Sequence, residues 1–303
     1  MDLLPGVDLN DEADLILLRS FFSTTAPGVI RAEMEGQGGG TLFCLELSVG
    51  AVAGLHRDDG PVALKRFASG TDPAHIAACH ALQRHLFASG FPCPEPLQLL
   101  SQPLAWVERW DTRGAWVDGN QPAWRARLAA LLARQVDLSR SFVAHFPPRR
   151  GAGKLWPEPH NALFDFSRPH PELDGIRARI PAPGGEEVVA HLDWSAKHFR
   201  HVGEQISVVY DWDSVQRVPE AAAVGQAALD LPATHVLDVR QQPTFEEMAA
   251  FRALYPRPVD ERSFWRAIVR GQAYTARCVA SHTPDAGNQP LQVLRELLAW
   301  LGW

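Results

Sequence analysis

The sequence has few features that would crosslink the chain or anchor it in a membrane. Its four cysteines, Cys44, Cys79, Cys93 and Cys278, are scattered and form no C-x-x-C pair, which argues against zinc ligation and against a disulfide framework. We therefore expect free thiols in a reducing cytoplasm. No apolar run approaches the length of a membrane span, and no basic-then-apolar leader opens the sequence. These absences predict a cytoplasmic protein without a membrane partner.

An excess of positive charge is also missing. The 29 Lys and Arg residues against 35 Asp and Glu give a net charge of −6, which argues against a nucleic-acid partner bound through a broad basic face. A hydrophobic content of 46% is ordinary for a soluble globular protein, and 303 residues suffice for one large domain or two lobes. Any phosphate group would have to be bound by local cations and a metal.

The most informative stretch is Val188–Val215, which reads VVAHLDWSAKHFRHVGEQISVVYDWDSV. An apolar run leads into H-L-D, which ends at Asp193, and a second apolar run leads into D-W-D, which begins at Asp211. The Gly203-Glu204 turn between the runs fits a hairpin connection. We therefore predict that the two aspartates lie at the ends of neighbouring strands, where their carboxylates converge.

Phosphoryl transfer needs such a pair of carboxylates. One positions the attacking hydroxyl and accepts its proton, and the other holds the metal that bridges the nucleotide phosphates. Here H-x-D at His191–Asp193 is followed five residues later by His198, and D-W-D follows at Asp211–Asp213. This pattern resembles the Brenner-type loop of the aminoglycoside phosphotransferase and choline kinase family, H-G-D-x-x-x-x-N and then I-D-W-[DE]. The alternative, two short strands that merely end in aspartates, explains each half of the pattern but not their joint occurrence.

The resemblance is close over this stretch and weaker over most of the chain. It implies an α+β, bilobal protein-kinase-like fold. The N-terminal lobe would be residues 1–108, an antiparallel sheet with a helix, preceded by a leading helix at 10–25. The C-terminal lobe would be residues 109–303, mainly helical with a short catalytic hairpin, carrying the catalytic loop and the acceptor site.

The resemblance also implies a role for each polar residue of the loop. Asp193 would be the catalytic carboxylate, and His191 would support the loop. Lys197 would stabilise charge on the transferring phosphoryl group, or would face solvent.

Asp211 would be the principal metal ligand, with Asp213 assisting it or binding a second metal. His198 stands where the family has asparagine, and imidazole is a poorer partner for Mg²⁺ than oxygen is. The implied cofactors are therefore ATP with Mg²⁺ or Mn²⁺.

Upstream, the segment V-A-L-K ending at Lys65 resembles the kinase V-A-I-K, whose lysine neutralises the α- and β-phosphates. Gly38, Gly39 and Gly40 could cover the phosphates, because glycine permits close backbone approach. A flexible turn explains this glycine run almost as well.

A helix should run from Asp72-Pro73 to Gly90, but it lacks the glutamate that pairs with the kinase lysine. Gln83 or a histidine would substitute for it, or Lys65 is not the nucleotide lysine.

The resemblance places the inter-lobe hinge at Val107 and Glu108, whose backbone would bind adenine. Trp106 or Trp110 would stack on the base, or would simply pack in the core.

Beyond the hinge, helical periodicity appears at 122–136, 221–229, 245–254, 261–281 and 291–303. The proline-rich segment 147–183 is predicted to be an irregular substrate-side insertion. Trp156, His160 and Asp165 would line the acceptor site, or would only pack this segment onto the lobe.

Three functions follow. The first is an ATP-dependent phosphotransferase that transfers the γ-phosphoryl group to a hydroxyl of a small molecule. The second is a kinase that acts on a peptide, and the third is a degenerate homologue that binds nucleotide or ligand without turnover. The expected partner is a small hydroxylated acceptor, and the expected state is a monomer or homodimer.

Overall fold

The computed structural model describes residues 4–147, 154–232, 242–282 and 288–303. Contacts divide the chain into two compact units. One comprises Met1–Ala88, Cys93–Thr112 and Pro159–Phe164, and the other comprises Ser89–Pro92, Arg113–Glu158 and Asp165–Trp303. The chain therefore crosses between the units more than once, and the lobe boundary at residue 108 stays a prediction.

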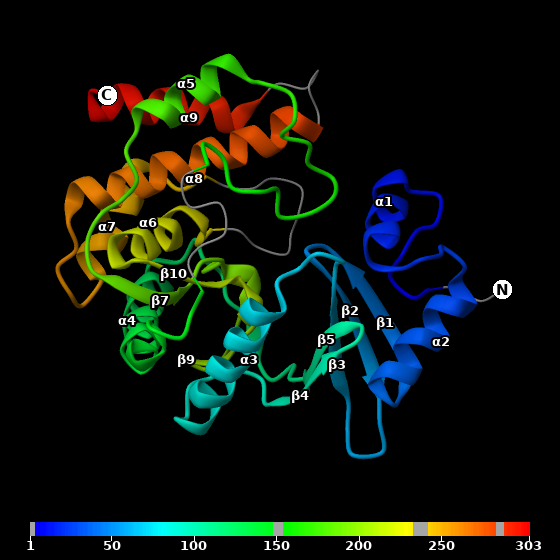
Figure 1. Cartoon of the computed structure of the whole chain (residues 1–303). Coiled ribbons are helices and arrows are strands. Elements are labelled where there is room, and N and C mark those ends of the chain that lie inside the picture. Colours follow the sequence, from blue (N-terminus) through cyan, green and yellow to red (C-terminus); the bar gives the residue numbers. More distant parts are fainter. Residues whose placement is uncertain (1–3, 148–153, 233–241, 283–287) are drawn as a thin grey trace. The chain divides into compact units, whose positions relative to one another are not determined.

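The first unit is built on a five-stranded antiparallel sheet (Figure 1). Its strands are β1 (Thr41–Leu47), β2 (Gly50–His56), β3 (Val62–Phe67), β4 (Pro96–Ser101) and β5 (Leu104–Arg109), in the order β1-β2-β3-β5-β4. Its helices are α1 (Glu12–Phe21), α2 (Pro27–Gly38) and α3 (Pro73–Ala88). The predicted antiparallel sheet with a helix and a leading helix is therefore confirmed.

The core of this unit lies where α1 and α2 pack on β1 and β2. Leu18, Ile30, Leu45 and Leu55 are fully buried there. Helix α1 begins with a side-chain cap, because the Asp11 carboxylate accepts the backbone N–H of residue 14. The helix cap and the alternation of apolar residues along the strands are the local sequence signals for this packing of helices on strands.

The second unit is mainly helical. Its helices are α4 (Pro122–Leu138), α5 (Pro171–Arg179), α6 (Glu220–Asp230), α7 (Phe245–Leu254), α8 (Glu261–His282) and α9 (Gln289–Leu301). Its strands are β6 (Ala115–Trp116), β7 (Glu187–His191), β8 (Phe199–Val202), β9 (Gln205–Val209) and β10 (Val215–Pro219). Short 3₁₀ turns lie at Arg140–Phe142, Ala196–His198 and Trp212–Ser214. Among the described residues, no helix is both long enough and apolar enough to span a bilayer.

The strand pairing corrects one prediction. The turn at Gly203, which has φ 57°, joins β8 to β9, and these two strands form the hairpin. Strand β7 pairs instead with β10, in a separate two-stranded sheet. The strands that lead to Asp193 and Asp211 are therefore not paired with each other. The prediction was wrong because the partner of β7 lies downstream of the D-W-D motif.

The segment 147–183 is less irregular than predicted, because it contains α5. Pro171 opens this helix and the His170 side chain caps it, since its Nδ1 accepts the N–H of Leu173. The Trp156 indole donates to Asp174 at 2.7 Å, so this tryptophan packs onto α5. Residues 148–153 of the predicted insertion lie outside the described residues.

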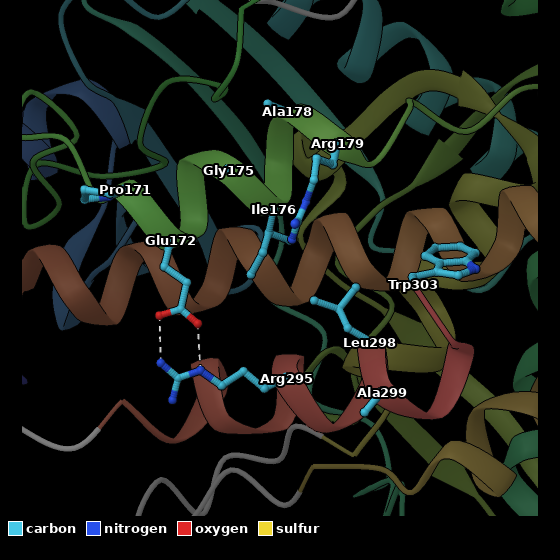
Figure 2. A pocket seen from close by; sticks show the side chains of 10 residues that line it. All are labelled: Pro171, Glu172, Gly175, Ile176, Ala178, Arg179, Arg295, Leu298, Ala299 and Trp303. Atoms are coloured by element: carbon cyan, nitrogen blue, oxygen red, sulfur yellow. Dashed lines mark hydrogen bonds and ion pairs between the residues drawn. The ribbon is translucent and has the colours of Figure 1, made fainter.

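A surface hollow of ≈ 770 Å³ lies beside α5 and α9 (Figure 2). At its edge Glu172 and Arg295 form a two-pronged ion pair with both N–O distances at 2.7 Å. Ile176 and Leu298 supply apolar lining, and Trp303 stands at its rim. None of the residues predicted for the site lines this hollow.

Candidate active site

His191 is the buried centre of the loop that carries the two aspartates. Its ring is fully buried at the end of β7, where Nε2 donates to the Tyr210 carbonyl at 2.9 Å. The N–H of Asp193 donates to Nδ1 at 3.2 Å. Because Nδ1 accepts this bond, the ring proton sits on Nε2, and the imidazole is neutral. His191 thereby ties the backbone before Asp211 to the backbone of Asp193. Its supporting role in catalysis stays a prediction.

Two tryptophans enclose this ring. Trp194 and Trp212, both fully buried, meet it edge to face with centroids 5.7 and 5.3 Å away. Burial, with a smaller contribution from the nearby His198 ring, lowers the pKa of the His191 imidazole to about 4. The His191 imidazole is therefore neutral in the folded protein at neutral pH.

This buried histidine predicts a pH dependence of stability. Its pKa is about 4 in the folded chain against 6.5 for the free side chain, so the unfolded chain binds more protons between these values. The free energy of unfolding should therefore fall as pH falls from about 6.5 to about 4. Chemical denaturation of wild type and His191→Phe across this range measures the effect. His191→Phe should lack this part of the decrease in the free energy of unfolding. If the decrease with falling pH were the same in both proteins, the low pKa of His191 would be contradicted.

Asp193 follows two residues after His191 and is surrounded by donors. Its Oδ2 lies 3.0 Å from the Lys197 ammonium and 2.9 Å from His198 Nε2, and its Oδ1 accepts the Ser195 hydroxyl at 2.7 Å. Burial acts to raise the pKa of this carboxyl, but these neighbours outweigh it and hold the pKa well below the usual range. Asp193 is therefore an anion, and about a third of its side chain remains exposed.

Asp211 has an unusual backbone. At φ 69° and ψ 46° it is the one non-glycine residue with positive φ in the described part of the chain. Such a conformation costs energy and concentrates at functional sites. It turns the chain out of β9 into the Trp212–Ser214 turn, and the Ser214 hydroxyl donates to Asp211 Oδ2 at 2.9 Å.

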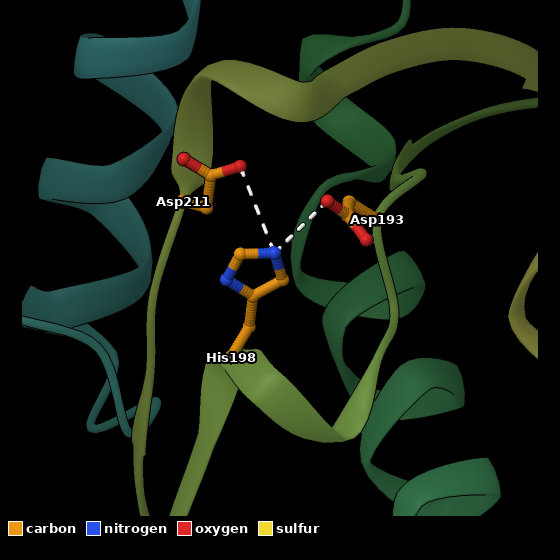
Figure 3. A group of neighbouring side chains, drawn as sticks. All are labelled: Asp193, His198 and Asp211. Atoms are coloured by element: carbon orange, nitrogen blue, oxygen red, sulfur yellow. Dashed lines mark hydrogen bonds and ion pairs between the residues drawn. The ribbon is translucent and has the colours of Figure 1, made fainter. Parts of the chain in front are cut away.

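His198 joins the two carboxylates. Its Nε2 lies 3.9 Å from Asp211 Oδ2 as well as 2.9 Å from Asp193 Oδ2, and Figure 3 shows the ring between them. One ligand atom from each of the three residues falls within 4.8 Å of the others, a spacing that could hold a metal ion. Asp213, the other predicted metal residue, is not in this group.

Backbone hydrogen bonds hold the two loops together. The N–H of Leu192 donates to the Ser214 carbonyl at 3.2 Å, and the N–H of Tyr210 donates to the His198 carbonyl at 3.0 Å. The convergence of Asp193 and Asp211 therefore comes from these cross-links and from His191, rather than from a shared hairpin.

Lys65 lies in the first unit, in the middle of β3. Its side chain is buried, with 6% exposed, and its register partners are Val52 on β2 and Trp106 on β5. A Cβ on Gly50 would come within 2.9 Å of Lys65 Cε, so glycine at the start of β2 leaves room for the lysine stem. A nucleotide-binding role for Lys65 stays a prediction.

The three glycines that were predicted to cover the phosphates lie where α2 ends and β1 begins. Gly38 is the last residue of α2, and Gly39 caps this helix in the left-handed conformation with its N–H on the Glu35 carbonyl. Gly40 comes directly before β1, and β1 turns into β2 downstream of all three glycines. The three glycines therefore end a helix and lead into a strand, which agrees with the alternative interpretation of this run as a turn. Phosphate binding by them stays a prediction.

Val107 and Glu108 lie inside β5, paired on one side with β3 and on the other with β4. The chain leaves the sheet only after Arg109, so the connection begins later than the predicted hinge. Trp106 is 2% exposed and is a core residue of the sheet. An adenine-binding role for this strand stays a prediction.

Gln83, one candidate to replace the missing helix glutamate, contacts other groups of the first unit. Gln83, on α3, is fully buried and donates to Glu108 at 2.7 Å and to the Pro94 carbonyl at 3.1 Å. Trp110 meets the ring of Phe43 edge to face. Within the first unit, Gln83 therefore hydrogen-bonds to β5 and to the segment before β4, and Trp110 packs against Phe43.

The two remaining acceptor candidates are exposed. His160 lies in the first unit and meets the Phe164 ring, and the Asp165 carboxylate, in the second, accepts the N–H of Ser167. Their role toward an acceptor stays a prediction.

Ser195 and Ser214 were not predicted, yet each hydroxyl donates to one of the two carboxylates. The signal was a serine two or three residues after each aspartate, a spacing typical of local side-chain hydrogen bonds.

Comparisons with known proteins identify the fold. No protein-family model matches the chain, and no curated protein matches it. Among solved structures, choline kinase LicA from Streptococcus pneumoniae aligns with a TM-score of 0.61 at 12% identity, over 91% of this chain and 98% of that one. The chain has a protein-kinase-like fold.

Other kinases of small molecules align similarly. A choline/ethanolamine kinase family protein from Mesorhizobium loti has a TM-score of 0.55 at 15% identity, over 96% of this chain and 95% of that one. Macrolide 2′-phosphotransferase MphH from Brachybacterium faecium has a TM-score of 0.51 at 15% identity, over 86% and 99%. The predicted fold class is confirmed. At such identities the likeness establishes the fold, and the activities in these names belong to those proteins.

Proposed function

We propose that the chain is an ATP-dependent phosphotransferase that transfers the γ-phosphoryl group to a hydroxyl of a small molecule. The observation that carries this proposal is the convergence of Asp193, His198 and Asp211 within 4.8 Å. Two carboxylates and an imidazole fit a divalent cation. A fold shared with choline kinases and a macrolide phosphotransferase supports the same chemistry, because this fold carries it in those proteins.

Asp193 would orient the acceptor hydroxyl. Its low pKa makes it a weak base, so its main contribution is to position the hydroxyl and to take its proton late, which suits a loose phosphoryl-transfer transition state. Lys197, 3.0 Å from this carboxylate, places a positive charge beside the reacting groups. His191 keeps the loop in place through its two backbone hydrogen bonds.

Asp211 and His198 would hold a divalent cation, whose positive charge would offset the negative charge of the nucleotide phosphates. The Ser214 hydroxyl, which donates to Asp211 Oδ2, fixes the orientation of this carboxylate. Asp213 lies outside the group of three, so we assign it no direct ligation.

ATP is proposed as the phosphoryl donor. A solved structure of LicA contains AMP, and that protein aligns with a TM-score of 0.60 at 11% identity. The buried Lys65 on β3 is the proposed phosphate ligand of the first unit, on the resemblance of V-A-L-K to the kinase motif. Mg²⁺ or Mn²⁺ is the proposed cation.

A second candidate function is nucleotide binding without turnover. It is favoured by the donors around Asp193, since Oδ2 already accepts from both Lys197 and His198. A carboxylate that is held in this way has less capacity left for an acceptor hydroxyl.

The test is transfer of label from γ-labelled ATP. Hydroxylated compounds are first ranked by thermal shift with a non-hydrolysable ATP analogue, and the panel includes amino alcohols, sugars, aminoglycosides and serine peptides. The proposal expects label on a small molecule, with either Mg²⁺ or Mn²⁺ present. Label only on peptides would favour the peptide kinase. Calorimetric ATP binding without transfer would favour the second candidate, and absence of ATP binding would end both.

A further inference from the structure

The His198 ring is held between two carboxylates by a single nitrogen. Its Nε2 lies 2.9 Å from Asp193 and 3.9 Å from Asp211, and the other ring nitrogen points away from both side chains (Figure 3). The backbone fixes this position, because the N–H of His198 donates to the Ser195 carbonyl and its carbonyl accepts from Tyr210. The side chain is only 15% exposed. A ring held in this way has one nitrogen with which to serve two partners.

That nitrogen cannot serve both partners at once. The Asp193 carboxylate is an acceptor, so Nε2 must carry a proton to bond to it. Metal ligation uses the lone pair of the same nitrogen, so the ring proton must then reside on Nδ1. An asparagine at this position would differ, because its oxygen can bind a cation while its NH₂ group still donates. The substitution by histidine therefore couples the cation to the state of Asp193.

Nitrogen ligation also changes which cation the site prefers. Mg²⁺ prefers an all-oxygen octahedral environment and gives up its waters reluctantly. Imidazole is a ligand of first-row transition ions, and Mn²⁺ is the member of this series that most resembles Mg²⁺ in its preference for carboxylate and water oxygens. A donor set of the Asp211 carboxylate and the His198 imidazole is therefore better matched to Mn²⁺ than to Mg²⁺.

We propose that His198 makes this site selective for Mn²⁺ over Mg²⁺, and that its ligation through Nε2 releases Asp193 Oδ2 for the acceptor hydroxyl. This inference rests on the proposed phosphotransferase function. It explains how a carboxylate oxygen that accepts from both His198 and Lys197 loses one of these two donors in the loaded protein.

The test measures ligation directly. Mn²⁺ and Mg²⁺ are titrated by calorimetry into wild type, His198→Asn and His201→Asn, with the cation alone and with a non-hydrolysable ATP analogue. Pulsed electron paramagnetic resonance then reports whether a nitrogen nucleus lies in the first coordination sphere of bound Mn²⁺. His201 is a matched control, because its ring lies against Trp124 in the same unit and outside the group of three.

Wild type and the His201 variant should show the nitrogen signal and should prefer Mn²⁺. In His198→Asn the signal should vanish, and the ratio of Mn²⁺ to Mg²⁺ affinity should fall about 10-fold or more. Wild-type Mn²⁺ bound by oxygen alone would overturn the inference, even if His198→Asn failed to fold. Equal preference in wild type and His198→Asn would overturn it too. Nucleotide binding with an oxygen-only cation would leave the proposed function standing, whereas no binding of cation or analogue would remove both.

Discussion

Replacing Asp193 with asparagine is expected to lower kcat for phosphoryl transfer by about 10²–10⁴-fold while the protein stays folded. The variant keeps the shape of the side chain, and its Oδ1 can still accept the Ser195 hydroxyl. It removes the negative charge that Lys197 and His198 face, and with it the group that orients the hydroxyl. Steady-state kinetics on an acceptor found in the panel gives the rate. Thermal melting and calorimetry with the ATP analogue show whether fold and nucleotide binding persist.

Glu204→Gln is the matched control for this experiment. It also neutralises one carboxylate in the same unit, but Glu204 lies in the turn between β8 and β9, where it is 85% exposed and pairs with Arg127. Such a surface pair contributes little to stability, so activity and melting should be unchanged. If Asp193→Asn turned over acceptor as fast as Glu204→Gln, Asp193 would not be the catalytic carboxylate.

Trp212→Ala is expected to lower the free energy of unfolding by about 3–5 kcal/mol. The indole is fully buried, donates to the Val209 carbonyl at 2.7 Å, and meets the rings of His191 and Phe91 edge to face. Its removal leaves a cavity beside His191 and takes one hydrogen-bond donor from the Val209 carbonyl. Urea denaturation followed by circular dichroism measures the change.

Trp303→Ala is the control that shows how much stability is lost when a tryptophan outside the loop is removed. Trp303 stands at the rim of the surface hollow and is 42% exposed, so its removal should cost less than about 1 kcal/mol. Trp212→Phe should fall between the two, because it keeps a ring but loses the indole N–H. A Trp212→Ala variant as stable as Trp303→Ala would mean that the loop does not depend on this packing.

Most of the secondary structure could be predicted from local sequence. The periodic helices at 122–136, 245–254 and 261–281 are present as α4, α7 and α8, with ends that differ by at most two residues. Caps and apolar alternation are properties of neighbouring residues, so the sequence carries them directly. Helix α5 was missed because its surroundings are rich in proline, which is usual for loops, although Pro171 opens the helix itself.

The candidate site could be predicted only in part. The two motifs predicted that Asp193 and Asp211 converge and that His198 is a cation ligand, and the structure brings these three residues together. The pairing of β7 with β10 could not be predicted, since strand pairing depends on the whole fold. The positive φ of Asp211 was equally hidden, because aspartate tolerates this conformation better than most residues but adopts it only in a minority of positions. Sequence therefore indicated which residues meet, and the structure showed what holds them there.

The most direct test of the central claim is phosphorus NMR of ATP incubated with the chain, Mn²⁺ or Mg²⁺ and a hydroxylated acceptor, with quenched samples stripped of metal before measurement. The account predicts that the γ-phosphate resonance declines as a phosphomonoester resonance grows at the same rate, and that Asp193→Asn and Asp211→Asn leave ATP essentially unchanged. Phosphomonoester formed at the wild-type rate by either variant, or release of inorganic phosphate alone by the wild type, would contradict it.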